Sequence, residues 1–450
     1  MKPYRLTTKA LALDEWGRGI IKVGKVAYAV SNLLPKEEGI IEINEELAYQ
    51  KAKLIKVTKA VSYRQDPACE VYQKCGGCQL LHMNYDMQTR FKKEYIINAF
   101  RAQKMNVKLD EYIGGTLKTA YRNKMQVAYR YRDHRIIYGF YEEESHRITA
   151  INACPVQTKS QNAIAAGIAK IMTQMKIPAY NEDKRSGLIR FALIKEAFQT
   201  KEILVTIVTQ SEIFPGRNDF VRRLRQQFPE ITTIVQNINS RQTSIILGEQ
   251  ERVLFGPGFI WEELLGMRFK ISSKTFFQIN PEQTRNLLQK VIDYGAFQKD
   301  EVVLDAYCGV GTIGLVVSPL VKQVIGVEAN KQSINNAIEN LRENHLDNLQ
   351  FINEDATEFM EKWLLSKKQV DVVIMDPPRS GSTERFLKAL INMQPRSIIY
   401  VSCEAQTLAR DVKTLSPVYE IKKMAAVDMF VGTYHVETVC VLTNRAGNNK

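Results

Sequence analysis

Two residues late in the sequence carry side chains that could perform covalent catalysis. Cys403 ends the apolar run RSIIYVSC, and Glu437 lies in YHVETVCVL, a second run with strand character. A thiolate at a strand end can act as a nucleophile where its pKa is lowered locally, and a nearby carboxylate can act as a base. Taken alone, Cys403 is equally well explained as a small buried residue that finishes a strand. With five histidines in the chain, a Ser-His-Asp or Cys-His hydrolase has little support, although His435 lies close to Glu437.

One reaction that such a pair of side chains could perform is the methylation of carbon 5 of a uracil ring. That carbon is too weak a nucleophile to accept a methyl group unaided, but a thiolate that adds to carbon 6 makes carbon 5 enolate-like. The carbon 5 proton must then leave before the thiolate is expelled, and this step requires a base. Cys403 is therefore the candidate nucleophile and Glu437 the candidate base.

A glycine loop indicates a nucleotide-type cofactor. The run VVLDAYCGVGTIGLVV holds Gly309, Gly311 and Gly314 in the spacing GxGxxG, between a predicted strand and a predicted helix. An acidic residue that ends the next strand, here Glu328 in VIGVEAN, can accept hydrogen bonds from both ribose hydroxyls. This combination serves either a nicotinamide dinucleotide or S-adenosylmethionine.

Three further carboxylates stand at strand ends in the same half of the chain. Asp305 lies four residues before Gly309, Asp355 follows a strand in NEDA, and Asp376 begins DPPRSG after VDVVIM. A helix cap or a turn explains each of them singly. Together they are expected at the carboxyl edge of a parallel sheet, where the substrates of such folds bind.

Four of the seven cysteines form a separate group. Cys69, Cys75 and Cys78 have the spacing Cys-x5-Cys-x2-Cys, and Cys154 follows in NACP. Four thiolates suit either a 4Fe-4S cluster or structural zinc, and the spacing does not choose between them. The gap of five residues argues against a radical S-adenosylmethionine enzyme, whose triplet is normally Cys-x3-Cys-x2-Cys. The odd count without an export signal argues against a disulfide framework.

The charge balance favours a polyanionic partner. The chain has 62 Lys and Arg against 49 Asp and Glu, and residues 87–135 hold twelve basic and four acidic side chains. Aromatic residues interleave with the basic ones in YRNKMQVAYRYRDHR, as on many nucleic-acid surfaces. The alternative is a solvated basic face with tyrosines in the core. No apolar run reaches the ~20 residues of a membrane span, so a cytoplasmic protein without a membrane partner is expected.

The order of the predicted elements divides the chain into three parts. Residues 1–60 show short strands with turn signals, which close most easily into a small β-barrel. Residues 61–270 contain the cysteine loop and then alternate helical with strand-like runs, which predicts an α/β or α+β domain. Residues 271–450 alternate strands with helices, which predicts a doubly wound, largely parallel α/β sheet.

The segments SCEAQTLARD, HVETVCVL, DPPR and FFQINPEQ resemble the signature motifs of the RNA uracil-5-methyltransferase family, and the resemblance spans essentially the whole chain. A TRAM-type, OB-like N-terminal barrel combined with a cysteine cluster is similar to the 23S ribosomal RNA branch. The resemblance implies a class I, Rossmann-like methyltransferase domain, S-adenosylmethionine as methyl donor, and 23S ribosomal RNA as the substrate that acquires 5-methyluridine. We also expect a monomer that binds no DNA. The resemblance favours a 4Fe-4S cluster held by Cys69, Cys75, Cys78 and Cys154.

The same resemblance assigns roles to further residues. It implies that Phe276 stacks near a flipped base, and that Arg379 supports the pocket. Gln278 and Asp376 would hydrogen-bond the uracil or the cofactor. The expected cofactor-binding set is Gln278, Asp305, Tyr307, Gly309, Gly311, Glu328, Asp355 and Asp376. The chain departs from the family in one place, since Asn-Pro commonly follows the nucleophile whereas Glu404 and Ala405 follow it here.

Three alternatives remain open. A nicotinamide-dependent oxidoreductase would use GVGTIG but leaves DPPR, Cys403 and the basic segment unexplained. A non-catalytic iron-sulfur RNA-binding protein would need only the barrel, the cysteine cluster and the basic segment. A transfer RNA uridine is the third alternative, as the substrate of the same chemistry, although enzymes of that branch usually lack both the barrel and the cluster.

Overall fold

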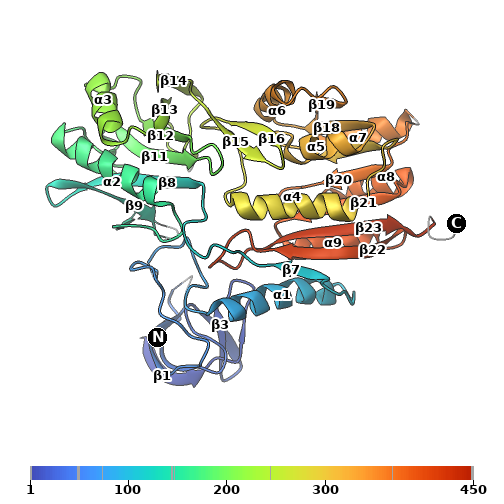
Figure 1. Cartoon of the computed structure of the whole chain (residues 1–450). Helices are drawn as coiled ribbons and strands as arrows, with labels where there is room; N and C mark the ends of the chain where they lie inside the picture. The colour runs from blue at the N-terminus through green and yellow to red at the C-terminus, as the bar shows by residue number, and fades with distance from the viewer. Residues whose placement is uncertain are drawn as a thin grey trace.

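The computed structural model describes residues 3–47, 51–72, 74–142, 145, 147–243, 245–366 and 368–446. Figure 1 shows a small N-terminal module below a larger body, in which a central sheet and a C-terminal sheet lie side by side. The predicted N-terminal range includes residues 1, 2 and 48–50, which lie outside the described residues.

The N-terminal module consists of two small antiparallel sheets around one apolar core. Because successive side chains of a strand point to opposite faces, Ile21, Ile41 and Ile43 are fully buried between the sheets. A closed barrel of the TRAM type stays a prediction. One sheet has the order β1 (Tyr4–Lys9), β5 (Glu38–Ile43), β6 (Ala52–Lys59), and the other has the order β2 (Ala12–Leu13), β3 (Gly19–Val23), β4 (Val26–Val30).

A mixed seven-stranded sheet forms the centre of the molecule, in the order β10-β9-β8-β11-β12-β13-β14. Its inner strands β11 and β12 are mostly apolar because both faces are covered, and nearly all their residues are buried. The helical runs expected from the sequence form α1 (Tyr85–Ala102) and α2 (Lys159–Gln174). The other elements are β8 (Lys124–Arg132), β9 (Arg135–Tyr141), β10 (Ile148–Ala150), β11 (Ile189–Glu196), β12 (Ile203–Thr209), α3 (Arg217–Gln227), β13 (Ile231–Ile238), β14 (Gln250–Phe255), and the hairpin of β15 (Ile260–Leu264) and β16 (Met267–Ile271).

The C-terminal part is built on an eight-stranded sheet with the order β19-β18-β17-β20-β21-β23-β22-β7. Strands β17 to β21 pair in parallel because a helix returns the chain after each strand, whereas β23 is antiparallel to β21 and β22. This arrangement is the predicted doubly wound, largely parallel sheet. Its strands are β7 (Glu111–Ile113), β17 (Val302–Ala306), β18 (Gln323–Glu328), β19 (Leu349–Asn353), β20 (Val372–Met375), β21 (Ser397–Ser402), β22 (Tyr419–Val427) and β23 (Glu437–Asn444).

Helices cover both faces of this sheet, and the strands alternate between two cores. In β17, Leu304 and Ala306 pack with residues of α1, α7, α8 and α9, whereas Val303 packs with residues of α4 and α5. No helix in the described ranges is both long enough and apolar enough to cross a membrane. The helices are α4 (Pro281–Gly295), α5 (Thr312–Val317), the short 3-10 helix η1 (Ser318–Leu320), α6 (Lys331–Glu343), α7 (Ala356–Leu365), α8 (Glu384–Met393) and α9 (Ala405–Leu415).

Two elements of the predicted range 61–270 pack on the C-terminal sheet. Strand β7 pairs in parallel with β22 and forms the edge of the sheet, and helix α1 packs against α9. Lys92 of α1 is fully buried and donates a hydrogen bond of 2.6 Å to Asp428, which is also fully buried. The boundary at residue 270 stays a prediction. The structure places β7 in the C-terminal sheet and α1 against helix α9 of that sheet.

Candidate functional site

The predicted site residues follow the carboxyl ends of neighbouring strands. Tyr307 follows β17, Glu328 ends β18, Asp376 follows β20 and Cys403 follows β21. Because these strands are parallel, their carboxyl ends lie at one edge of the sheet. The chain leaves β17 toward β18 on one side, and β20 lies on the other side, so this edge contains the topological switch point where such sheets bind ligands.

The glycine loop leaves open space at this edge. Gly309 and Gly311 have φ angles of 57° and 80°, which side chains rarely adopt. A Cβ at Gly311 would lie 2.4 Å from the Phe351 ring, whereas a Cβ at Gly309 would meet nothing within 4 Å. Glu328 holds the loop, because one carboxylate oxygen accepts from the Gly309 amide at 3.2 Å and the other from the Asn330 amide at 2.7 Å.

Asp305 is a buried carboxyl beneath this loop. One oxygen accepts a hydrogen bond from the Gly314 amide at 2.8 Å, and the other is buried without a partner among the described residues. Burial raises the pKa of Asp305 to about 7, the Gly314 amide opposes this shift, and Asp376 and Glu328 add to it. A group that carries positive charge and N–H donors would satisfy both the orphaned oxygen and the excess of acidic groups. The methionine end of S-adenosylmethionine is such a group, so these residues fit that cofactor.

Asp355 and Tyr307 lie further along the same edge. Asp355 is the N-cap of α7, where one oxygen accepts from the amides of Thr357 and Glu358 at 2.9 and 3.2 Å. The helix cap that the sequence offered as the simple explanation is therefore present. Tyr307, at a φ of 61°, exchanges a hydrogen bond of 2.9 Å with Ser382.

The structure brings Cys403 and Glu437 together across two strands. The last paired residues of the antiparallel strands β21 and β23 are Ser402 and Thr438, and Cys403 and Glu437 are the next residue along each chain. The charge of Glu437 acts on the thiol, because it contributes to the raised pKa of Cys403. Cys403 is partly buried and Glu437 is almost fully buried, so the acid is shielded from bulk water.

The acidic groups around Cys403 favour their protonated forms in the free protein. Burial raises the pKa of Glu437 to about 8, with a further contribution from Asp376, while Arg379 opposes the shift. Burial likewise raises the pKa of Asp376 to about 7. The pKa of Cys403 is raised to about 11 by burial and by the charges of Glu437 and Asp376, and Arg379 again opposes the shift. Arg379 is thus a cation that favours ionisation of both the thiol and the acid.

His435 joins this group from the loop before β23. Its Nε2 lies 3.4 Å from a guanidinium nitrogen of Arg379. Burial and the charge of Arg379 are the leading causes that lower the pKa of His435 to about 4, so the ring is neutral near pH 7. The sequence drew attention to His435 only as a neighbour of Glu437, because a single histidine in a loop has no distinctive spacing.

Phe276 and Gln278 lie on a loop that is held by the central sheet. Lys195 of β11 is buried and donates to the backbone oxygens of Ser272, Ser273 and Thr275 at 2.8, 3.0 and 2.7 Å. Asn123 donates a hydrogen bond of 2.9 Å to the backbone oxygen of Gln278. The loop is thereby fixed while the Phe276 side chain stays 68% exposed, free to contact a ligand. Sequence patterns identified neither Lys195 nor Asn123, because both occur singly in strand-like segments.

The four clustered cysteines surround one cavity. Cys69, Cys75, Cys78 and Cys154 line a cavity of about 260 Å³ together with Arg122. Burial is the main cause that raises the pKa of Cys78, to about 12, and the thiol of Cys154 adds to the shift. Within the described part of the chain, no three Cys, His, Asp or Glu side chains are arranged to hold a single metal ion. Thiols around a cavity are the donor set of an iron-sulfur cluster, whose sulfur ligands lie further apart than the ligands of one ion.

The cysteine loop touches the loop that leads to Glu437. The amides of Gln79 and Leu80 donate to the backbone oxygen of Gly432 at 3.0 and 2.8 Å. From the other side, Tyr121 donates a hydrogen bond of 2.9 Å to the backbone oxygen of Val431. The cysteine loop and the loop that leads to Glu437 are therefore joined by hydrogen bonds.

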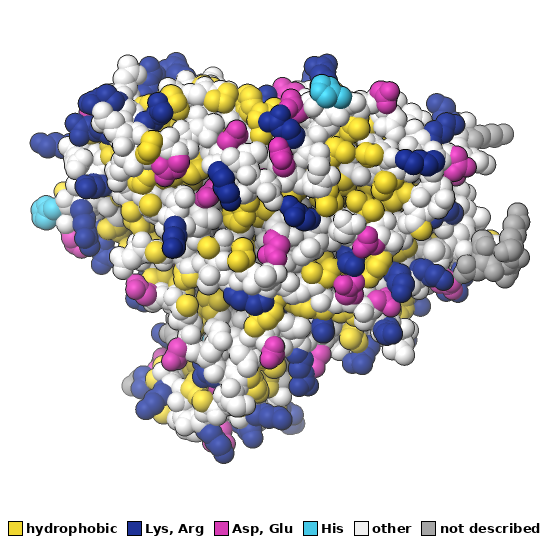
Figure 2. Space-filling model, viewed as in Figure 1, with side chains coloured by type: hydrophobic (Ala, Val, Ile, Leu, Met, Phe, Trp, Pro, Cys, Tyr) yellow, Lys and Arg dark blue, Asp and Glu magenta, His cyan; other side chains and the backbone are white. Residues whose placement is uncertain are grey.

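The basic segment 87–135 divides between surface and core. Tyr121 and Tyr129 are buried, as is Lys92, whereas Tyr131 is 62% exposed. The alternative of core tyrosines is thus correct for part of the segment. Figure 2 shows Lys and Arg side chains gathered over the N-terminal module and, at the upper left, over the region of α2 and α3. Basic surface of this kind can follow a phosphate backbone.

Comparisons with known proteins agree on one type of protein. The sequence family described as tRNA (Uracil-5-)-methyltransferase matches residues 84–445. An uncharacterized RNA methyltransferase of Oceanobacillus iheyensis is 36% identical over 452 residues, which cover 99% of this chain and 97% of that protein. Another, from Staphylococcus aureus strain COL, is 35% identical and covers 97% of each chain.

Among solved structures, this chain is similar to the Pyrococcus abyssi tRNA (uracil-54, C5)-methyltransferase in complex with S-adenosyl-L-homocysteine. The TM-score is 0.79 at 28% sequence identity, and the match covers 97% of this chain and 99% of that chain. The similarity therefore extends beyond the eight-stranded sheet to the N-terminal module and the central sheet.

Proposed function

Because the chain belongs to the RNA uracil-5-methyltransferase family, we propose that it methylates carbon 5 of a uridine in 23S ribosomal RNA, with Cys403 as nucleophile and Glu437 as base. The observation that carries this proposal is the proximity of Cys403 to Glu437, at the adjoining ends of β21 and β23, together with Asp376 and Arg379. S-adenosylmethionine supplies the methyl group, and the S-adenosyl-L-homocysteine bound to the similar Pyrococcus abyssi protein supports this choice.

The reaction proceeds by addition and elimination at the uracil ring. The Cys403 thiol gives its proton to a neighbouring carboxylate other than Glu437, for which Asp376 is the candidate. The thiolate sulfur bonds to carbon 6 while the electron pair of the double bond shifts toward carbon 5 and the carbonyl oxygen. Carbon 5 would then take the methyl group from S-adenosylmethionine, whose sulfur–methyl bond breaks to leave S-adenosyl-L-homocysteine. Glu437 removes the carbon 5 proton, the double bond re-forms, and the carbon 6–sulfur bond breaks to release Cys403 as the thiolate.

Glu437 must be ionised to act as the base. Burial opposes this, because it raises the pKa of Glu437 to about 8 and keeps much of it protonated in the free protein near pH 7. Arg379 lowers the pKa of both Glu437 and Cys403, so it favours the ionised forms that attack and proton removal require. We assign Arg379 this supporting role, and we assign Phe276 and Gln278 to the uracil side of the pocket.

The cofactor would lie over the glycine loop. Asp305 and Glu328 would accept hydrogen bonds from the amino and ribose ends of S-adenosylmethionine, and Gly309 and Gly311 would allow its close approach. Asp355 would contact the adenine with the carboxylate oxygen that does not cap α7. Gln278, Tyr307 and Asp376 complete the proposed set.

The cavity of Cys69, Cys75, Cys78 and Cys154 would hold a 4Fe-4S cluster with a structural role. The hydrogen bonds of Gln79, Leu80 and Tyr121 to the loop 428–436 would then order the segment that precedes Glu437. Protein purified without oxygen should be brown and contain iron. A colourless, zinc-loaded protein would refute the cluster.

Transfer RNA is the second candidate substrate. The Pyrococcus abyssi structure matches 97% of this chain, including the N-terminal module, and its name states a tRNA uracil as the target. The N-terminal module therefore does not by itself separate the two substrates. The proposal of ribosomal RNA rests on the combination of this module with the cysteine cluster, which resembles the ribosomal RNA branch.

The decisive experiment maps 5-methyluridine in RNA from a strain that lacks this protein. Loss of the modification from 23S ribosomal RNA, restored by the wild type but not by Cys403→Ala, would support the first candidate. Loss from transfer RNA alone would support the second. Normal 5-methyluridine in both RNAs, or full restoration by Cys403→Ala, would refute the proposed function. Cys440→Ala is the matched control, because Cys440 is buried on the same strand as Glu437 but belongs to the apolar core.

A further inference from the structure

The residue after Cys403 organises the loop that carries the thiol. Glu404 is the N-cap of α9, and its carboxylate accepts a hydrogen bond of 3.4 Å from the Gln406 amide. The backbone of Glu404 exchanges hydrogen bonds of 3.0 and 3.1 Å with the Ser402 hydroxyl. Cys403 is thus enclosed between two residues that bond to each other, and its position depends on how Glu404 is held.

Helix α1 provides a second contact to Glu404. The Tyr95 hydroxyl donates a hydrogen bond to the same carboxylate oxygen that caps α9. Tyr95 keeps its proton, because burial and the adjacent Glu404 raise its pKa above the usual value. Tyr95 and Glu404 are 309 positions apart in the sequence, so this contact exists only because α1 packs against α9.

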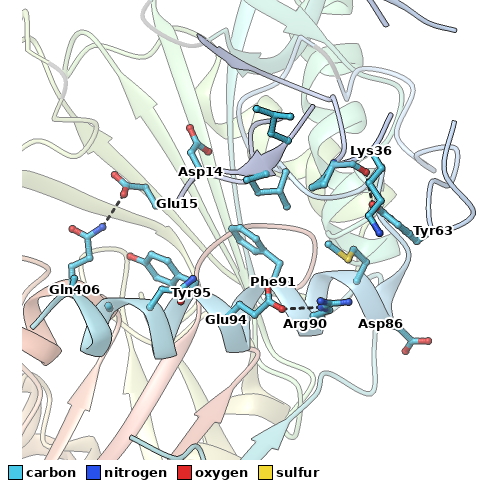
Figure 3. Close-up of a pocket in the computed structure, with 18 of the residues that line it drawn as sticks. Asp14, Glu15, Lys36, Tyr63, Asp86, Arg90, Phe91, Glu94, Tyr95 and Gln406 are labelled. Atoms are coloured by element: carbon cyan, nitrogen blue, oxygen red, sulfur yellow. Dashed lines mark hydrogen bonds and ion pairs between the residues drawn. The ribbon is translucent and has the colours of Figure 1, made fainter. Parts of the chain in front are cut away.

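Tyr95 lies in the wall of a cleft between the N-terminal module and α1. This cleft has a volume of about 980 Å³, and Figure 3 shows Tyr95, Phe91 and Glu94 of α1 along it. At one end, Gln406 donates a hydrogen bond of 3.0 Å to Glu15 of the N-terminal module (Figure 3). The segment 404–406 therefore contacts both α1 and the N-terminal module.

The opposite side of the loop is tied to the DPPR segment. The Thr407 hydroxyl lies 3.2 Å from the backbone oxygens of both Arg379 and Glu404. The loop that carries Cys403 is thus held by Thr407 of α9 on one side and by Tyr95 of α1 on the other. Removing the Tyr95 hydroxyl would release only the second side.

We propose that Glu404 is a positioning residue for Cys403, oriented by Tyr95, and that this pair takes the place of the Asn-Pro that commonly follows the nucleophile in the family. Asn-Pro stiffens a helix start through a side-chain cap and a fixed φ at the first helical residue. Glu404 and Ala405 lack the proline ring, and the contact from α1 supplies the missing restraint. The inference rests on the proposed function of Cys403, and the test separates the two.

The test compares three variants with a matched control. Tyr95→Phe removes one hydroxyl, Glu404→Gln keeps a cap and an acceptor oxygen, and Glu404→Ala removes both. Glu94→Gln is the control, because Glu94 lies beside Tyr95 in the same cleft but pairs with Arg90 on the exposed face of α1. Thermal melting verifies that each variant folds.

Two measurements report on the position of the thiol. The first is the rate at which iodoacetamide alkylates Cys403 across pH, followed on the Cys403 peptide by mass spectrometry. The second is kcat and KM for methyl transfer to RNA. We expect Tyr95→Phe and Glu404→Ala to lower kcat about tenfold, the effect of losing one hydrogen bond to a charged group, and to change KM by less than about twofold. Both should alter the pH profile of alkylation, and Glu404→Gln should retain most of kcat.

Wild-type kcat and a wild-type alkylation profile in both Tyr95→Phe and Glu404→Ala would overturn the inference. So would a Glu404→Gln variant as impaired as Glu404→Ala, or equal impairment by the Glu94→Gln control. Failure of the proposed function would show itself differently, as methylation that survives in Cys403→Ala. The alkylation profile needs no methyl transfer and reports on the Tyr95–Glu404 contact in either case.

Discussion

Cys403 and the four clustered cysteines lie in different chemical environments. Cys403 is surrounded by groups that exchange protons or carry charge, namely Glu437, Asp376 and Arg379. The described residues that line the four-cysteine cavity include no Asp or Glu, and the thiols interact chiefly with each other and with Arg122. A thiol that forms and breaks a carbon–sulfur bond needs a proton acceptor beside it, whereas thiols that bind metal need each other. The difference is consistent with the proposal that Cys403 reacts and that the four clustered cysteines serve as ligands.

The two environments nevertheless meet at a single loop. Gly432 accepts two hydrogen bonds from the cysteine loop and lies five residues before Glu437. A substitution in the cysteine cavity should therefore affect the site around Cys403 indirectly, by changing the position of this loop. The predictions below test how far the two sites are independent.

The largest effect is expected from Glu437→Gln. Without the base, Cys403 still attacks and carbon 5 still accepts the methyl group, but the adduct cannot resolve, so turnover should fall about 10²–10⁴-fold. A covalent RNA–protein complex should accumulate and be visible on a denaturing gel. Normal turnover without adduct would show that Glu437 is not the base. The contrast between the two thiol environments would then lose its proton acceptor beside Cys403.

A substitution in the cysteine cavity should act on stability before it acts on chemistry. Cys75→Ser removes one proposed metal ligand, so the protein should lose bound iron and melt at a lower temperature. Cys403 should still form the adduct with RNA, although more slowly because the loop around Gly432 is less ordered. The measurements are iron content, thermal melting and adduct yield, with Cys308→Ser, a thiol outside the cavity, as control. Unchanged iron and melting in Cys75→Ser would contradict the ligand role.

The pH dependence of stability should distinguish the acidic site from the cavity. The raised pKa of Glu437, about 8, means that the folded protein binds a proton that the unfolded chain has released above about pH 4.5. Stability from this group is therefore present at low pH and is lost as pH rises toward 8. Relative to the wild type, Glu437→Gln should gain a few kcal/mol in free energy of unfolding between pH 5 and pH 8. Denaturant titrations of the free proteins measure this, and a constant difference across that range would show that the acid is not perturbed.

The smallest effect is expected at Asn123, which lies between the two sites. Asn123 follows Arg122 of the cavity wall and donates to the backbone oxygen of Gln278 in the Phe276 loop. Losing this neutral hydrogen bond in Asn123→Ala should raise KM for RNA by roughly threefold to tenfold and leave iron content unchanged. Loss of iron in this variant would mean that the two sites are more tightly coupled than the contacts indicate.

Much of the architecture follows from local sequence patterns. The alternation of apolar strands and amphipathic helices after residue 300 predicted the doubly wound sheet, and the helices α1 and α2 were expected from their periodicity. Polar residues at strand ends also identified most of the candidate site. Buried polar residues were not predicted. Lys92 was counted with the basic surface, and Lys195 was not noticed, because their burial depends on partners more than 70 positions away.

The sequence by itself determined which residues could react: a thiol and a carboxylate near strand ends, a glycine turn, and four cysteines in a ligand-like spacing. Tertiary structure alone decided which of them meet. Strand β23 inserts antiparallel between β21 and β22 and so brings Glu437 near Cys403, while helix α1 brings Tyr95 to Glu404. The physical reason is that strand order and helix packing are set by burial summed over the whole core, which no local pattern records.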